Sequence, residues 1–281
     1  MSQKTQDILK QLEEGVQALF DSENYRKYLS FLSSFHAYSF RNSLLIFMQC
    51  QQRGITPTLC APYRDWQKKH RHVKRGEKGI AIIAPHVYKA KKTGSDEDAD
   101  RIGFHVTYTY DISQTEPDDD FGEVPEICHR LEGDLADEAL LPFLADLCPV
   151  EVTFKPIDGE VNGYYDPIAK TITVDPATSQ TQQAKTLLHE WAHAEHFDYD
   201  PYIKEETTSE DRELIAESTA YIVCRYLGID SSDYSFGYLA AWSKSGSTKA
   251  LKRHMDTIRL LADAMILKIE DAMNDTLDRH Q

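Results

Sequence analysis

Apolar side chains in the first third of the chain change from the spacing of a helix to that of a strand. Ile8, Leu12, Val16 and Leu19 recur at every third or fourth position, which predicts an amphipathic helix. Beyond Gly79, a short apolar run and then alternation of apolar and polar residues are typical of strands. The pattern predicts helices over residues 5–20 and 66–70, one or two helices over residues 24–52, and strands over residues 80–84 and 103–112.

The remainder of the chain shows a second series of helical and strand patterns behind an acidic segment. Residues 116–126 carry Pro117 and Pro125 among acidic side chains, and they are the best candidate for a domain linker. We therefore expect an α+β fold with two domains, residues 1–122 and 123–281. Beyond the linker, the pattern predicts helices over residues 134–148, 179–197, 206–227, 236–244 and 248–277, with strands over residues 150–154, 160–165 and 170–174.

Composition excludes several classes of protein. The 281 residues are 41% hydrophobic and 27% charged, so wholesale disorder and a collagen-like fibre are excluded. We expect neither membrane insertion nor a secretion signal, because no apolar run approaches the ~18–20 residues of a membrane span and the N-terminus lacks a basic-then-apolar leader. The five cysteines are scattered and form no CxxC pair, which favours a reducing cytoplasm over a disulfide framework.

The net charge of −15 is divided unevenly along the chain. Residues 1–92 hold sixteen Lys and Arg against seven Asp and Glu, so their net charge is +9, and the rest of the chain carries −24. The total excludes a uniformly basic nucleic-acid binder, but Arg64–Lys92 holds ten basic residues interleaved with aromatic side chains. Cations follow a phosphate backbone and flat side chains stack on unpaired bases, so this segment favours nucleic-acid binding. A solvated charged surface is the alternative interpretation.

The sharpest chemical feature is the sequence His189-Glu190-Trp191-Ala192-His193. Residues four apart lie on one helix face with Cβ atoms about 5–6 Å apart, so both imidazoles can reach one metal ion. Glu190 then lies beside the ion, where it can take a proton from water. The alternative is a pair of histidines whose hydrogen bonds are satisfied at a helix surface.

A third metal ligand is expected from the next predicted helix. Catalytic zinc sites have three protein ligands and an open fourth position. Glu213 and Glu217 share a helix face with the small residues Ala216 and Ala220, which permit close helix packing. The alternative is two solvated glutamates on an amphipathic helix.

The gluzincin metallopeptidases, in which a Glu-x-x-x-Asp helix follows HExxH, resemble this arrangement. The resemblance implies a Zn²⁺ ion held by His189, His193 and Glu213, with Glu217 orienting a ligand histidine. Because Glu stands where the family has Asp, Glu217 is an alternative ligand. The implied activity is that of a zinc metalloendopeptidase, in which the catalytic Glu190 takes a proton from water and delivers it to the leaving amine.

Neighbouring residues complete the expectations for this site. The predicted hairpin before the HExxH helix could bind an extended peptide along its edge strand, or it could be an ordinary hairpin. His196 as a fourth ligand would close the site and abolish hydrolysis. Tyrosines that could stabilise an oxyanion are Tyr164, Tyr199 and Tyr221.

The two parts together resemble the ArdC-type antirestriction proteins of conjugative plasmids and mobile genetic elements. The similarity lies in residues 38–46 (YSFRNSLLI), 66–69 (WQKK), 71–80 (RHVKRGEKGI) and 111–115 (DISQT), then in the HExxH helix, residues 213–220 and residues 234–236 (YSF). It implies a single-stranded-DNA-binding domain over residues 1–122 and a zincin-like metallopeptidase domain over residues 123–281. It further implies protection of incoming single-stranded plasmid DNA from host restriction.

Charge and resemblance agree on the residues that would contact DNA. Aromatic residues beside apolar ones are often core residues, and Asn42 could cap a helix, so a structural role is the alternative for each. Non-specific binding of this kind has a steep salt dependence. The candidate phosphate contacts are Arg41, Lys68, Lys69, Arg71, Lys74, Arg75 and Lys78, and the candidate stacking groups are Tyr38, Phe40 and Trp66.

Three functions follow from these features. The first is an antirestriction protein that binds single-stranded DNA and carries a zinc-dependent peptidase domain acting on a peptide or protein. The second is a regulatory metalloprotease that cleaves a DNA-bound repressor. The third is a non-catalytic DNA binder whose metal is structural.

Overall fold

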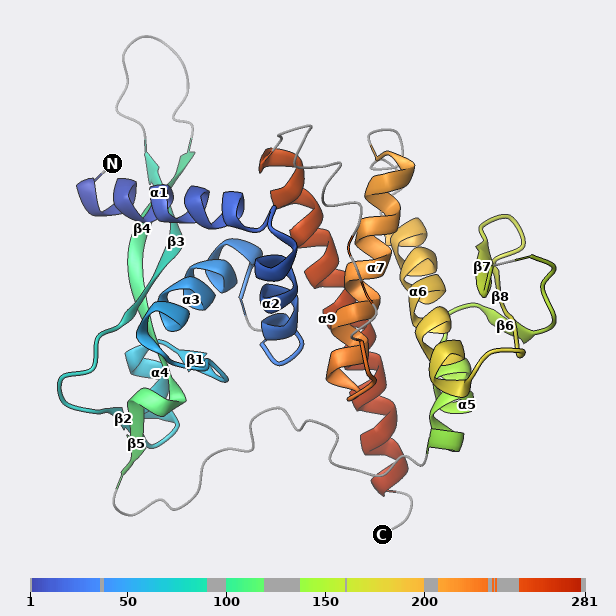
Figure 1. Ribbon diagram of the computed structural model, residues 1–281. Helices are drawn as coiled ribbons and strands as arrows, with labels where there is room; N and C mark the ends of the chain where they lie inside the picture. Colours follow the sequence, from blue (N-terminus) through green and yellow to red (C-terminus); the bar gives the residue numbers. More distant parts are fainter. Residues whose placement is uncertain are drawn as a thin grey trace. The chain divides into compact units, whose positions relative to one another are not determined.

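The computed structural model describes residues 2–35, 38–89, 100–118, 137–159, 161–199, 207–231, 234, 236 and 248–278 (Figure 1). Two compact units divide the chain. The first consists of Met1–Leu19 and Ala37–Ile127, and the second of Phe20–His36 and Cys128–Gln281. The units therefore differ from the sequence-predicted ranges 1–122 and 123–281, because residues 20–36 belong with the C-terminal part.

The first unit is built on a long antiparallel pair of strands, β3 and β4, whose register runs from Ile80 opposite Thr109 to Lys89 opposite Asp100 (Figure 1). The short β1 extends this sheet in the order β1-β4-β3, and β2 pairs with β5. The elements are α1 (Gln3–Ala18), α3 (Phe40–Arg53), β1 (Cys60–Ala61), α4 (Tyr63–Lys68), β2 (Arg71–Val73), β3 (Ile80–Lys89), β4 (Asp100–Asp111), η1 (Ile112–Gln114) and β5 (Thr115–Pro117).

Two side-chain amides of α3 satisfy the outer edge of β3. Asn42 Nδ2 donates to the Ile83 carbonyl at 3.0 Å and Asn42 Oδ1 accepts from the Ile83 amide at 2.9 Å. Gln49 makes the same pair with Ala81, at 2.8 and 2.9 Å. Asn42 and Gln49 are seven residues apart and therefore lie on one face of α3. Ala81 and Ile83 are two residues apart on β3 and have the same orientation, so one helix face meets both strand residues. The Asn42 amide thus fixes α3 on the sheet, and no helix cap forms there.

The second unit combines α-helices with a three-stranded sheet in the order β6-β8-β7. β6 and β8 are parallel, whereas β7 and β8 form the predicted hairpin. The elements are α2 (Ser22–Leu32), α5 (Asp137–Leu147), β6 (Glu151–Phe154), β7 (Gly163–Asp166), β8 (Thr171–Val174), α6 (Gln180–Tyr199), α7 (Ser209–Tyr226) and α9 (Thr248–Asp278).

Helix α2 packs on α7 and so contributes to the second unit. Tyr25 Oη and Ser218 Oγ are 2.8 Å apart and buried, and Ser30 Oγ lies 2.8 Å from Tyr221 Oη. Burial raises the pKa of Tyr25, so its hydroxyl keeps its proton. The core of this unit is formed by α6, α7 and α9, with buried side chains that include Leu187, Leu188, Trp191, Leu214, Ile215, Ile222, Met255, Ile258 and Met265.

Most predicted elements are confirmed. The stretch 24–52 forms two helices, α2 and α3, and the short helix begins at Tyr63 rather than Trp66. Most of the predicted helix 236–244 and of the linker 116–126 lies outside the described residues. Among the residues that the structure describes, no helix is both long and apolar enough to cross a membrane.

Candidate functional site

The histidines of the HExxH sequence lie on α6, whose N-terminus is capped by a side chain. Ser179 Oγ accepts a hydrogen bond from the Gln182 amide at 3.2 Å, the usual pattern of an N-terminal cap. Leu188, Trp191 and Ala192 are fully buried. This burial fixes the rotation of α6 and leaves the His189 and His193 side chains partly accessible, at 25% and 18%.

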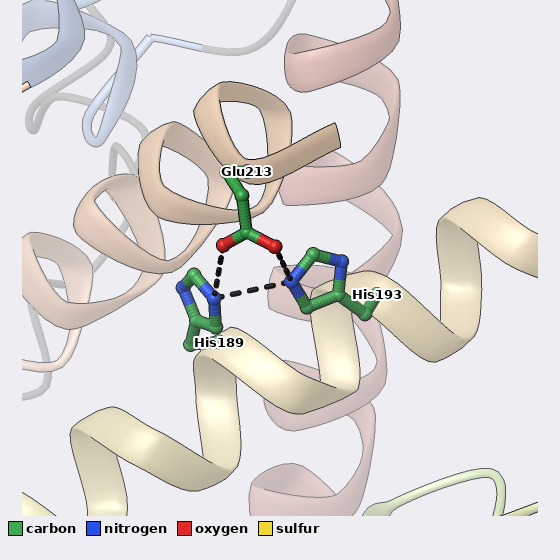
Figure 2. A group of neighbouring side chains, drawn as sticks. All are labelled: His189, His193 and Glu213. Carbon is green, nitrogen blue, oxygen red and sulfur yellow. Dashed lines mark hydrogen bonds and ion pairs between the residues drawn. The ribbon is translucent and has the colours of Figure 1, made fainter. Parts of the chain in front are cut away.

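Helix α7 brings Glu213 to the two histidines (Figure 2). Thr208 caps the helix in a reciprocal capping box with Asp211, and the small Ala216 and Ala220 are buried, as expected for close helix packing. The Glu213 carboxylate oxygens lie 3.4 Å from His189 Nε2 and 3.5 Å from His193 Nε2.

The three side chains have the geometry of a metal-binding group. Their nearest ligand atoms lie within 4.8 Å of one another, and the two Nε2 atoms are 3.1 Å apart. Two ligands held about 2.1 Å from a tetrahedral ion lie about 3.4 Å apart, so the distances fit a divalent cation. Glu217 was predicted either to orient a ligand histidine or to be the alternative ligand. It lies one turn further along α7 and lines a cavity together with His189 and Glu213, but it is outside this group of three.

The electrostatics of the site follow from this proximity. Hydrogen bonds from His189 and His193 hold the pKa of the Glu213 carboxyl well below its usual value. Burial lowers the pKa of His189, but the bond to Glu213 and the negative charges of Glu190, Glu213 and Glu217 outweigh it, so the net shift is upward. The site therefore attracts positive charge.

Two cavities adjoin the three side chains. One, of about 350 Å³, is lined by His189, Glu190, Glu213 and Glu217, with polar side chains of α6. The other, of about 690 Å³, is lined by His189, Glu190 and His193 together with residues of β7. Glu190 is only 9% exposed yet lines both cavities, so it borders the space next to the histidines.

Gly163 allows the edge strand β7 to lie close to α6. A Cβ atom on Gly163 would stand 2.4 Å from Thr186 Cγ2 and 2.9 Å from the Thr173 carbonyl oxygen. Gly163 lines both cavities, and Tyr164 and Tyr165 line the larger one. Only glycine, which has no side chain, allows so close an approach, and β7 can therefore lie next to the site.

The other neighbouring residues have different roles. His196 is buried and lines the larger cavity, outside the group of three. Tyr221 is bonded to Ser30 in the core, whereas Tyr164 is 40% exposed at the larger cavity. Lys185, which our reasoning from sequence missed, lines the smaller cavity. The sequence signal for Lys185 was its position four residues before His189, which places it on the same helix face.

Two of the predicted DNA contacts in the first unit are wrong. Trp66 is fully buried, and its Nε1 atom donates to the Tyr110 carbonyl at 2.9 Å, so it cannot stack on a base. Arg71 is 6% exposed, and its guanidinium bonds Thr115 through Oγ1 and the carbonyl oxygen, at 2.9 and 3.2 Å, so it holds β2 to β5.

The stacking groups on α3 and before it are also structural. Phe40 is fully buried. Tyr38 Oη donates to the Cys60 carbonyl at 3.1 Å and lies 2.8 Å from Thr109 Oγ1. Burial raises the pKa of Tyr38 to about 12. These contacts hold the start of α3 to β1 and β4.

The remaining predicted phosphate contacts are exposed. Lys68 pairs with Asp65 at 2.7 Å, and Lys74 Nζ donates to the Ser113 carbonyl at 2.9 Å, yet both side chains reach solvent. The six exposed cations of this group are Arg41, Lys68, Lys69, Lys74, Arg75 and Lys78.

Family models match both parts of the chain. Residues 1–117 match the N-terminal domain of anti-restriction factor ArdC, and residues 147–226 match the IrrE N-terminal-like domain of the M78 peptidases. The second range contains all of the histidines and glutamates discussed above.

Solved structures and one curated relative agree with these matches. The metal-free crystal structure of the antirestriction protein ArdC from plasmid R388 has a TM-score of 0.58 at 19% identity, covering 84% of this chain and 86% of that chain. Its Mn(II)-bound structure has a TM-score of 0.59 at 17% identity, covering 92% and 97%. These two likenesses show a shared fold.

An uncharacterized protein of Bacillus anthracis is 23% identical over 98% of this chain and 53% of its own length, so the chain spans about half of that relative. The resemblance seen in the sequence is confirmed by the two family matches taken together. The chain therefore combines an ArdC N-terminal domain with an IrrE-like domain of the M78 peptidase family, which is the pair of domains implied by its resemblance to the ArdC-type proteins.

Proposed function

We propose that the second unit is a zinc-dependent metallopeptidase. The observation that carries the proposal is the convergence of His189, His193 and Glu213 at 3.1–3.5 Å beside a cavity that Glu190 also lines. When bound, Zn²⁺ would supply a Lewis acid that polarises a peptide carbonyl and acidifies water. Mn²⁺ is bound by the related R388 protein, and a His₂Glu site accepts several divalent ions.

Glu190 is the proton carrier of the proposed reaction. Its carboxylate takes a proton from the attacking water and gives it to the leaving amine. His189, His193 and Glu213 would be three protein ligands beside a cavity, which is typical of a catalytic rather than a closed structural site. This argues against the structural-metal alternative.

Strand β7 is the expected docking edge for a peptide. It lies at one end of the β6-β8-β7 sheet, and its residues Gly163 and Tyr164 line the cavities at the histidines. An extended peptide that adds to this edge would lie beside Glu190. Its backbone would supply affinity, and the cavities would select its side chains.

The test of the peptidase is the variant Glu190→Gln. We expect it to retain one bound metal ion per chain while cleavage of a random peptide library, followed by mass spectrometry, falls by at least about a hundredfold. His189→Ala, which removes a ligand, should lose both the bound metal ion and peptide cleavage. If Glu190→Gln cleaves as fast as the wild type, the hypothesis of a structural metal replaces the proposed peptidase.

We further propose that the first unit binds single-stranded DNA non-specifically and that the protein acts in antirestriction. The ArdC N-terminal match and the six exposed cations support this proposal. With Trp66, Phe40 and Tyr38 engaged in the fold, the contacts would be mainly to phosphate. A regulatory protease that cleaves a DNA-bound repressor would use the same surface.

Salt titration tests the DNA surface. Replacing Lys68, Lys69, Lys74 and Arg75 by glutamine should weaken binding of a labelled single-stranded oligonucleotide, and the log–log salt slope should flatten by about 0.7 for each lost contact. A control with the same change of net charge keeps the wild-type slope. It replaces four exposed cations of the second unit, Lys27, Lys155, Lys170 and Arg253. Equal loss in both variants would refute the assignment.

A further inference from the structure

A lysine is built into the wall of the smaller cavity. Lys185 lies on α6, is only 9% exposed, and lines the cavity with His189 and Glu190. Lysine is among the residues least often buried, because removing its charge from water costs free energy. The proposed hydrolysis assigns Lys185 no part.

Helix geometry fixes how far Lys185 lies from the metal ligands. It stands four residues before His189, so the two lie on one helix face about 6 Å apart along the axis. An extended peptide advances about 3.3 Å per residue. For a peptide that runs along α6, Lys185 would lie beside a residue about two positions from the bond that would be cleaved.

The cavity around Lys185 contains groups of both charges. Its lining combines Lys185 and the neutral polar residues Asn162, Gln182 and Thr186 with the carboxylates of Glu190, Glu213 and Glu217, whose negative charge a bound divalent cation would offset. Among the described residues that line this cavity, Lys185 is the one lysine or arginine. A cation among amide and hydroxyl groups forms charge-assisted hydrogen bonds with a carboxylate, and it repels a basic side chain.

We propose that Lys185 is a specificity-determining residue, which selects peptides with a carboxylate within about two residues of the scissile bond. The proposal rests on the peptidase function proposed above. The carboxylate belongs either to an Asp or Glu side chain or to a free C-terminus. Were Lys185 only to neutralise the cavity glutamates, binding would show no preference among peptides.

Binding of matched peptide pools tests the proposal separately from catalysis. Glu190→Gln protein, reconstituted with one equivalent of Zn²⁺, is titrated with fluorescent pools that differ in one residue, Glu or Gln, and in a free or amidated C-terminus. We expect the acidic pool, or the pool with the free C-terminus, to bind about tenfold more tightly than its neutral match. The arm that carries the preference identifies the source of the carboxylate.

Substitutions at Lys185 decide whether this residue is responsible. The preference ratio should fall to about one in Lys185→Met, invert in Lys185→Glu and survive in Lys185→Arg. Lys27→Met removes an exposed lysine that lines neither cavity, and it should keep the ratio. A wild-type ratio of one, or a ratio unchanged in Lys185→Met, would overturn the proposal.

Cleavage of the same pools by protein that retains Glu190 separates the two claims. A Lys185-dependent binding preference without any cleavage would reject the peptidase and support Lys185 as a carboxylate-binding residue. Cleavage that is indifferent to the carboxylate would support the peptidase and reject the role of Lys185.

Discussion

At the scale of single residues, Glu213 is the side chain that links the two histidines. Its two oxygens lie 3.4 and 3.5 Å from two imidazole nitrogens that are themselves 3.1 Å apart. These four polar atoms are held at these distances by burial of the α6 and α7 faces behind them. A divalent cation would accept a lone pair from each of the three side chains at once, which is why we propose Glu213 rather than Glu217 as the third ligand.

The two glutamates should differ in their effect on metal affinity. We expect Glu213→Gln to weaken Zn²⁺ binding by more than about a hundredfold, and Glu217→Gln, which removes a neighbour of the site, by about tenfold. Competitive calorimetry with a chelator measures both constants. If the order were reversed, Glu217 would be the third ligand.

His254 should make the second unit sensitive to acid. It is 1% exposed, with its Nε2 atom 3.7 Å from Asp211 Oδ1. Burial lowers the pKa of His254 to about 4, although Asp211 opposes the shift and Arg253 and His196 add to it. An unfolded histidine has a pKa near 6.5, so on acidification the unfolded state binds the proton first, and stability falls from about pH 6.5 towards pH 4.

Urea unfolding at pH 7 and pH 5 measures this effect. Between these two pH values, the unfolding free energy of the wild type should fall by at most roughly 2 kcal/mol more than that of His254→Gln. Equal losses in the two proteins would show that His254 does not keep its neutral form in the folded state.

Single residues also show where reasoning from sequence succeeds and fails. His189 and His193 could be placed because helix spacing alone brings them together. Trp66 and Arg71 could not, because a segment of cations and aromatic residues is compatible with either a DNA surface or a folded core. In the fold, Trp66 is bonded to the Tyr110 carbonyl and Arg71 to Thr115, and each of these partners is more than forty residues away in the sequence.

At the scale of elements, local patterns predicted α6, α7 and the β7–β8 hairpin, since periodicity and turn residues suffice for each. The contact of β7 with α6 was not predictable in the same way. It depends on a glycine whose absent side chain matters only once the hairpin and the helix are packed. The cavities, and with them Lys185, follow from that contact.

Gly163→Ala tests this packing. The added Cβ would stand 2.4 Å from Thr186 Cγ2, so β7 and α6 must move apart, at a cost of about 1–3 kcal/mol in unfolding free energy and with loss of peptide cleavage. Adding Thr186→Ser should recover part of the stability, because it removes the nearer clash. Thr186→Ser alone is the control. Wild-type stability in Gly163→Ala would contradict the close approach of β7.

At the scale of the whole molecule, charge and chain organisation carry different information. The basic excess of residues 1–92 and the acidic remainder predicted two parts with different partners. The chain does not divide at one point, however, since residues 20–36 lie within the second unit through Tyr25 and Ser30. An amphipathic helix shows in the sequence that it needs a partner, but not which unit supplies one.

The most direct measurement of the central claim is the metal content of the full chain, purified without added metal and then saturated with Zn²⁺ and desalted. Elemental analysis should find about one ion per chain in the wild type and in Glu190→Gln, and about a tenth of that or less in His189→Ala and Glu213→Gln. Equal metal in all four proteins, or none in the wild type, would contradict the claim that His189, His193 and Glu213 form a metal centre.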